Sequence, residues 1–203
     1  MKADHPNLMK VHEILEDDRH YYIISELMHG GELYDRILQL KRFTEKDAAE
    51  IMNQMLRALN YMHKKNIAHR DIKPENVLME SKDANNTSLK ITDFGFAQAY
   101  DPKNGLMTAK LGSPLYMAPE IIKETPYDCA VDIWALGVLC YIMLSGKPPF
   151  KGKSKDEIFV QITSKQIAYT SDHWKNASKE AKAFLKKMLV RDPKARKTAE
   201  ELL

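Results

Sequence analysis

The stretch HRDIKPENVL, residues 69–78, gathers acidic, basic and amide side chains around a proline and then becomes apolar. Phosphoryl transfer requires a carboxylate to orient the attacking hydroxyl, a cation for the developing charge, and metal ions that neutralise the phosphate oxygens. Asp71 and Lys73 supply the first two groups, while Asn76 and Asp93 supply the hard oxygen ligands that magnesium prefers. This order of residue types points to phosphoryl transfer.

A hairpin and a helix are predicted ahead of this stretch. Residues 8–15 and 21–25 have the apolar content of two strands, with a turn at residues 16–18. Thr44 is a good N-cap, and the helix that it begins ends at residues 64–66. Its apolar positions recur at helical spacing and predict a face turned to the core: Ala48, Ile51, Met52, Met55, Leu59 and Met62.

A second hairpin and a buried helix are predicted after the stretch. Residues 77–79 and 89–92 are short apolar runs separated by a polar loop, which is typical of a hairpin. Residues 131–144 are mostly apolar, but they include an aspartate and fall short of the ~20 residues of a membrane span. A helix inside the core is therefore expected there.

Capping residues predict three further helices. Ser154 and Thr198 have capping-box spacing to Glu157 and Glu201, and Ser178 begins a helix without the full box. The long irregular segment between the buried helix and the second hairpin, residues 100–115, is expected to have a function of its own.

Composition favours a soluble globular protein of one domain or two small ones. The chain has 203 residues, 44% of them hydrophobic, and a net charge of +3 that argues against nucleic acid and membrane partners. Cys129 and Cys140 form no CxxC motif, and no signal peptide begins the chain, so a reducing compartment is expected. A cytoplasmic monomer is the resulting expectation.

Four further motifs accompany the opening stretch in a fixed order: ITDFGFAQ at 91–98, SPLYMAPE at 113–120, DIWALG at 132–137 and RDPKAR at 191–196. Together they resemble the catalytic half of the eukaryotic protein kinases, over essentially the whole chain. The resemblance implies an α+β fold with a mostly helical large lobe. It also implies that residues 1–28 are a remnant of the small β-lobe with the hinge, and that residues 29–203 form the large lobe.

The resemblance implies a role for each polar residue of the stretch. Asp71 accepts or orients the proton of the substrate hydroxyl, and Lys73 is the cation near the transferred phosphate. Asn76 and Asp93 hold Mg²⁺, and ATP is the phosphate donor. A lysine two residues after the catalytic aspartate resembles the motif of the serine/threonine kinases. The expected substrates are therefore Ser and Thr residues of proteins.

Nucleotide binding is assigned by the same resemblance. Glu26 and Met28 fall on the segment that links the lobes, where backbone groups bind adenine. Leu78 is expected beneath the adenine ring, and Glu32 is expected to reach the ribose. Ser25 lies at the back of the pocket, where a small side chain leaves room for bulky inhibitors.

Other motif residues are interpreted as structural. His69 and Arg70 are expected to brace the catalytic loop, and Asp132 to tie that loop to the buried helix. Glu120 and Arg196 are expected to form a buried ion pair, whose loss reduces stability rather than chemistry.

Several stretches resemble the calcium/calmodulin-dependent kinase group, among them GGELYDRI, LCYIMLSGKPPF and HWKNASKEAKAFLKKMLVRDP. In that group Glu32 and Glu75 face a basic substrate residue, which implies a preference for arginine near the acceptor. Ser113 is assigned to substrate binding as well. A calcium sensor or an upstream kinase is the implied regulatory partner.

The segment between Gly95 and Ala118 corresponds to the activation loop of the family. Arg70 is placed to pair with a phosphate there, and Thr108 is the expected acceptor. The usual acceptor position, three residues before Gly112, holds Ala109 instead.

No glycine-rich phosphate loop precedes residues 4–8, and no lysine–glutamate pair of the small lobe is recognisable. The chain is therefore expected to be truncated at both ends and to bind ATP poorly by itself. The alternative is a non-catalytic kinase-lobe binding module. A phosphate-binding hydrolase is disfavoured because no Walker-type loop is present.

Overall fold

The computed structural model describes residues 4–175 and 177–203. These described residues form seven α-helices: α1 Leu33–Leu40, α2 Glu45–His63, α3 Pro119–Ile122, α4 Ala130–Ser145, α5 Lys155–Ser164, α6 Lys179–Met188 and α7 Ala199–Leu202. The strands are β1 Val11–Glu16, β2 Tyr21–Ser25, β3 Ile67–Ala68, β4 Val77–Met79, β5 Leu89–Ile91 and β6 Gln98–Ala99. Short 3₁₀ turns are η1 Pro74–Asn76, η2 Phe94–Phe96 and η3 Asp172–Trp174. The predicted α+β class is confirmed.

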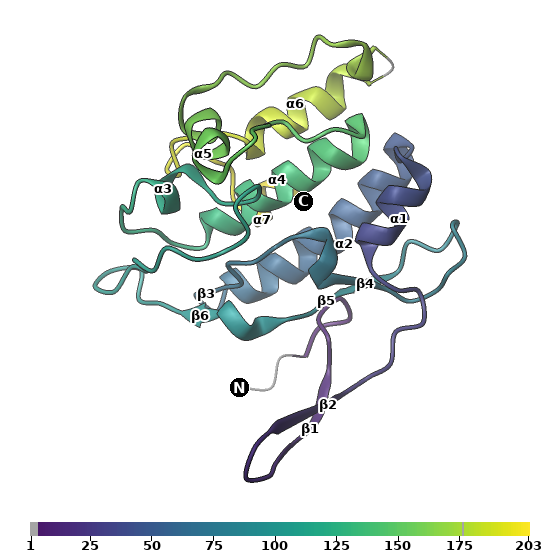
Figure 1. Ribbon diagram of the computed structural model, residues 1–203, viewed down its shortest axis with the longest axis vertical. Helices are drawn as coiled ribbons and strands as arrows, with labels where there is room; N and C mark the ends of the chain where they lie inside the picture. Colours follow the sequence, from purple (N-terminus) through teal and green to yellow (C-terminus); the bar gives the residue numbers. More distant parts are fainter. Residues whose placement is uncertain (1–3, 176) are drawn as a thin grey trace.

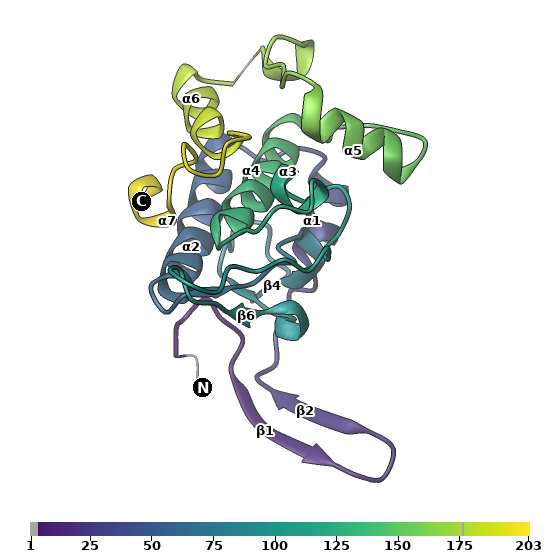
Figure 2. The ribbon, with the colours of Figure 1, turned by 90° about the vertical axis from the view of Figure 1, so that its left-hand side faces the viewer.

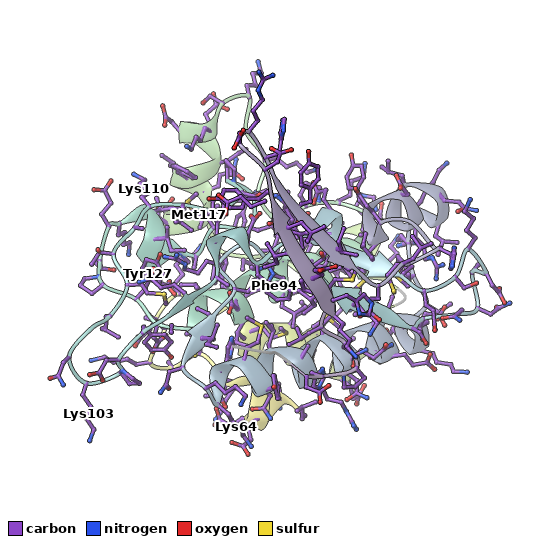
Figure 3. All side chains as sticks on the ribbon, turned by 90° about the horizontal axis from the view of Figure 1, so that it is seen from below. Lys64, Phe94, Lys103, Lys110, Met117 and Tyr127 are labelled. Carbon is purple, nitrogen blue, oxygen red and sulfur yellow. The ribbon has the colours of Figure 1, made fainter. Side chains whose placement is uncertain are left out.

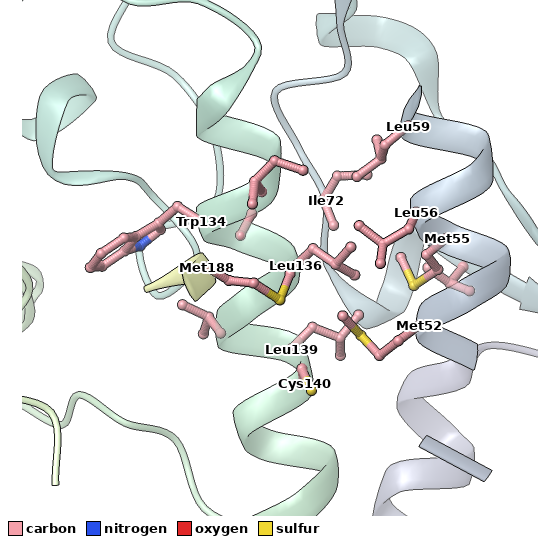
Figure 4. Close-up of a cluster of buried hydrophobic side chains, with 14 of the residues drawn as sticks. Met52, Met55, Leu56, Leu59, Ile72, Trp134, Leu136, Leu139, Cys140 and Met188 are labelled. Carbon is pink, nitrogen blue, oxygen red and sulfur yellow. The ribbon is translucent and has the colours of Figure 1, made fainter. Parts of the chain in front are cut away.

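Helices α2 and α4 form the centre of the core, side by side (Figure 1). The predicted stripe of α2 is buried along its length, and Met52 and Leu56 face Leu136 and Leu139 of α4 (Figure 4). Helix α4 is buried nearly all round, as the run 131–144 predicted. The ring of Trp134 stacks on Phe150, with centroids 5.9 Å apart. None of the helices in residues 4–175 and 177–203 is long and apolar enough to cross a membrane.

The described residues form three two-stranded sheets, and two of these sheets flank the HRDIKPENVL stretch. Strand β3, which precedes the stretch, pairs with β6, and β4, which closes it, pairs with β5. All three pairings are antiparallel. The predicted second hairpin is thereby confirmed.

The β1–β2 hairpin projects away from the helices (Figures 1 and 2). All of its strand residues are exposed, including the apolar Ile14, Tyr21 and Ile23. The predicted start of the first strand at residue 8 is wrong by three residues. Leu8 is buried and bridges Ile91 of β5 instead, because the backbone of residues 7–9 bonds to β5 rather than to β2.

The predicted caps are mostly confirmed. Thr44, Ser178 and Thr198 each accept a hydrogen bond from the backbone N–H three residues later. Thr198 also has the complete capping box. The cap at Ser154 is confirmed as well, because its hydroxyl accepts from the Glu157 N–H at 3.2 Å. Its capping box is incomplete, because the side chain of Glu157 accepts from the backbone of Lys153 rather than from that of the cap.

Candidate active site

The catalytic loop between β3 and η1 is held by one buried carboxylate from α4. Asp132 Oδ2 accepts from the backbone N–H of His69 at 2.9 Å, and Oδ1 accepts from that of Arg70 at 2.8 Å. Arg70 has a left-handed backbone, with φ of 69°, which the surrounding bonds must hold. The predicted role of Asp132 as a tie between loop and helix is confirmed.

His63, at the end of α2, completes this anchor. Its Nε2 lies 2.8 Å from Asp132 Oδ2, and both side chains are nearly inaccessible to solvent. Burial lowers the pKa of His63, but the bond to Asp132 and the nearby Cys129 outweigh it and raise that pKa to about 10. Burial acts to raise the pKa of Asp132, but His63 outweighs it and the pKa lies below its ordinary value. The anchor is therefore an ion pair at neutral pH.

Asp71 lies at the centre of the predicted catalytic group. Its Oδ2 is 2.7 Å from Lys73 Nζ and accepts from Asn76 Nδ2 at 3.0 Å. Its Oδ1 accepts from Ser113 Oγ at 2.9 Å, and Lys73 Nζ also donates to Ser113 Oγ at 3.1 Å. Burial opposes ionisation, but the Lys73 ammonium and the Ser113 hydroxyl outweigh it and lower the pKa of Asp71. The structure thus brings these four residues together around an ionised carboxylate.

Asp93 and Asn76 lie at adjacent ends of two elements. The backbone N–H of Thr92 donates to Asn76 O at 2.9 Å, which joins the end of β5 to η1. Asp93 is exposed, has φ of 58°, and accepts from the Gly95 N–H at 3.2 Å. The side-chain NH₂ group of Asn76 donates hydrogen bonds to Asp71. The side-chain oxygen of Asn76 is therefore the group that remains for a ligand.

These donors fit magnesium. Mg²⁺ is usually held by one or two protein oxygens together with substrate phosphates and water, so a full protein cage is not required. Residues 4–175 and 177–203 contain no cluster of three or more His, Cys, Asp or Glu side chains able to hold a metal.

The segment after β2, which carries the residues assigned to nucleotide binding, lies against β4. Glu32 forms a bridge with Leu78, and the backbone of Gly30 donates to Met79 O at 2.9 Å. The carboxylate of Glu26 lies 3.0 Å from Lys90 Nζ, and its backbone N–H donates to Lys10 O at 3.1 Å. The backbone carbonyl of Glu26 is therefore the group that remains for adenine. Met28 is half-buried on the same segment.

Glu75 carries an unsatisfied acceptor beside the catalytic loop. Its Oε2 is buried and has no hydrogen-bond partner among the described residues. The neighbouring phenol of Tyr116 has a raised pKa, mainly because it is buried and also because of the Glu75 charge. A buried carboxylate oxygen without a protein donor is uncommon, and it can accept a hydrogen bond from a water molecule or from a ligand.

The activation segment places Thr108 on the surface. Arg70 Nε donates to Phe96 O at 2.7 Å, and Nη1 donates to the hydroxyl of Tyr127 at 3.3 Å. Arg70 has no hydrogen bond to Thr108 among the described residues, so their predicted pairing through a phosphate stays a prediction. Sequence reasoning missed Tyr127, whose only signal is an apolar position shortly before the buried helix.

The predicted ion pair between Glu120 and Arg196 is confirmed. Arg196 Nη1 and Nη2 lie 2.6 and 3.0 Å from the two carboxylate oxygens, and both side chains are buried. The guanidinium also lies over the ring of Trp134, 5.3 Å from its centroid. This pair ties α3 to the loop before α7.

A carboxylate paired with a lysine, together with an asparagine and a second aspartate at the end of a strand, is the set of side chains that phosphoryl transfer in protein kinases uses. Comparison with known proteins agrees with this geometry. The protein kinase domain family matches residues 1–203. The calcium/calmodulin-dependent protein kinase type 1 of Macrobrachium nipponense is 40% identical over 202 residues, an alignment that covers the whole chain and 58% of that relative. The chain belongs to the protein kinase domain family.

Proposed function

We propose that the chain carries the phosphoryl-transfer site of a serine/threonine protein kinase that uses ATP and Mg²⁺. The observation that carries this proposal is the arrangement at Asp71, with Lys73 Nζ at 2.7 Å, Asn76 Nδ2 at 3.0 Å and Ser113 Oγ at 2.9 Å. A non-catalytic binding module has no need of an ionised carboxylate held in this way.

In the proposed reaction, Asp71 accepts the hydrogen bond of a Ser or Thr hydroxyl and directs its oxygen toward the terminal phosphate. The lowered pKa keeps the carboxylate ionised at neutral pH, as this role requires. Lys73 offsets the negative charge that develops on the phosphate oxygens. Bound Mg²⁺ neutralises phosphate charge, and Asn76 and Asp93 are the residues that would hold it.

The hydroxyl of Ser113 donates to Asp71 in the way that we propose for a substrate hydroxyl. It donates to Oδ1, and its N–H lies 3.2 Å from the same oxygen. The same hydroxyl accepts from Lys73 Nζ, so Ser113 helps to fix the distance between Asp71 and Lys73. We assign Ser113 to positioning the substrate segment beside Asp71.

We propose that the protein substrates carry arginine near the acceptor. The unsatisfied Oε2 of Glu75 supports this, because a guanidinium would supply the donor that it lacks. A peptide array with the full-length protein should show selection for arginine that Glu75→Gln weakens. The exposed Glu80→Gln should keep it. No basic preference in the parent enzyme would disprove this substrate assignment.

Regulation by a calcium sensor is proposed from the name of the 40% identical relative. We expect calcium-loaded calmodulin to change the activity of the full-length protein, and a response equal to that of a calcium-free control would refute this.

Phosphate transfer from ATP to a Ser peptide tests the proposed reaction. With the full-length protein, Asp71→Asn should lower kcat by about 10²–10⁴-fold, because an amide cannot take the proton. Asp156→Asn, at an exposed aspartate of α5 outside the activation segment, should leave kcat unchanged. Equal rates for Asp71→Asn and the parent would refute the assignment of the catalytic base.

A further inference from the structure

Tyr127 makes contacts on both sides of Thr108, the exposed residue of the activation segment. Its backbone exchanges two hydrogen bonds with Met107, both of 2.9 Å. Its hydroxyl donates to Ala109 O at 2.7 Å. The side chain is 3% exposed although it lies in a loop, which places the phenol inside the molecule. One residue therefore fixes positions 107 and 109 together.

The same hydroxyl reaches the catalytic loop. Arg70 Nη1 donates to Tyr127 Oη at 3.3 Å, and Arg70 Nε donates to Phe96 O at 2.7 Å. Arg70 directly precedes Asp71, and Phe96 lies three residues after Asp93. A chain of hydrogen bonds thus connects Phe96, close to Asp93 in the sequence, through Arg70 and Tyr127 to Ala109. Figure 3 shows Tyr127 on the same side of the molecule as Lys110, whose ammonium pairs with Glu124 at 2.7 Å.

An arginine beside a catalytic aspartate needs an acceptor to fix its guanidinium. A phosphate on the neighbouring segment is one such acceptor, because it adds charge and three oxygens. In this chain a neutral phenol and a backbone carbonyl already supply two acceptors. The phenol can do this because its oxygen accepts from Arg70 while its hydrogen is donated to Ala109.

We propose that Tyr127 is a positioning residue that holds the activation segment against Arg70 without a phosphate on Thr108. This inference rests on the proposed function for its effect on activity, but its effect on the segment is independent of catalysis. The regulatory consequence is that the dephosphorylated enzyme is already ordered at residues 107–109. Modification of Thr108 then adds little to the rate.

Hydrogen exchange on the 203-residue chain tests the structural half. Tyr127→Phe removes only the hydroxyl, and Tyr141→Phe is a matched control. Tyr141 is also buried, donates to Ala168 O at 3.1 Å and accepts from Trp174 Nε1 at 3.1 Å. Both variants should lower the melting temperature to a similar extent. Only Tyr127→Phe should speed amide exchange in residues 105–112, by about tenfold.

Kinetics of the full-length protein test the regulatory half. After phosphatase treatment the parent should keep its kcat within about twofold, whereas Tyr127→Phe should lose about tenfold in kcat with little change in the KM for ATP. Phosphorylation of Thr108 should restore the variant. A purely structural defect would not be rescued in this way.

Two results would overturn the proposal. One is exchange in residues 105–112 that is no faster in Tyr127→Phe than in Tyr141→Phe. The other is a parent enzyme that loses its kcat after phosphatase treatment. If the protein transfers no phosphate at all, the proposed function fails, and the exchange measurement still decides the role of Tyr127 in ordering the segment.

Discussion

Replacement of Asp132 by asparagine should destabilise the protein strongly, because this buried carboxylate ties the catalytic loop to α4. It is fully buried and accepts from His69 N, Arg70 N and the ring of His63, all within 2.9 Å. An amide keeps one acceptor oxygen and turns an NH₂ group toward N–H donors. It also leaves the raised-pKa His63 without a counter-charge.

The magnitude follows from these contacts. Breaking a buried pair by removing one charge costs about 3–5 kcal/mol, a large part of the ~5–15 kcal/mol that stabilises a typical domain. For a chain of this size, that loss corresponds to a melting temperature about 6–20 °C lower. Urea denaturation at neutral pH should show the change in free energy with little change in the slope. Glu124→Gln, in the exposed pair with Lys110, should leave the midpoint nearly unchanged.

The same anchor sets a pH dependence. The pKa of Asp132 is lowered from 3.8, so its contribution is present above that value and is lost as the pH falls through the folded pKa. The pKa of His63 is raised from 6.5 to about 10, so its contribution is complete below 6.5 and fades as the pH rises toward 10. His63→Gln should therefore flatten the alkaline limb of the stability profile. An Asp132→Asn variant as stable as the parent, or an alkaline limb unchanged in His63→Gln, would refute the reasoning.

Three further predictions concern other contacts. Arg196→Leu should cost about 3–5 kcal/mol in urea denaturation because it strands the buried Glu120, and adding Glu120→Leu should recover part of the loss; a loss in the single variant too small to resolve would contradict this. Gly30→Ala should cost about 1–3 kcal/mol by the same assay, since an added Cβ would meet the carbonyl oxygen of Met79 at 2.5 Å, and an unchanged midpoint would show that the segment yields freely. Ser25→Phe should block bulky ATP-competitive inhibitors in the full-length protein, and retained sensitivity in inhibition assays would disprove the position assigned to Ser25.

Local patterns predicted much of this fold. The α2 stripe, the apolar α4 run and the cap at Thr44 depend on neighbours within one or two turns, so residue spacing reveals them. The pair of Glu120 and Arg196 lies 76 residues apart and was predictable only through the resemblance to kinases.

Features that depend on tertiary contacts were not predictable. Leu8 leaves the first strand because a distant strand, β5, takes up the backbone around it. The polar loop between β4 and β5 is bound by Arg36, whose guanidinium donates to the carbonyls of Ser81 and Asn86. Neither contact leaves a periodic signal, since each joins segments far apart in the chain.

The same limit applies to the candidate site. The types and order of Asp71, Lys73, Asn76 and Asp93 predict phosphoryl transfer from the sequence, with each residue's role implied by the resemblance to the kinases. Tyr127 carried no such signal, because a tyrosine near a helix start is ordinary until its hydroxyl is seen between Arg70 and Ala109.

Magnesium-dependent nucleotide binding tests the central claim most directly. Calorimetric titration of the full-length protein with ATP, with and without Mg²⁺, should show that Asp93→Asn abolishes most of the gain in affinity from the metal. Asp71→Asn should retain that gain, because its carboxylate is assigned to the acceptor hydroxyl. An Asp93→Asn variant that binds magnesium-ATP as tightly as the parent would contradict the assignment of this site to phosphoryl transfer.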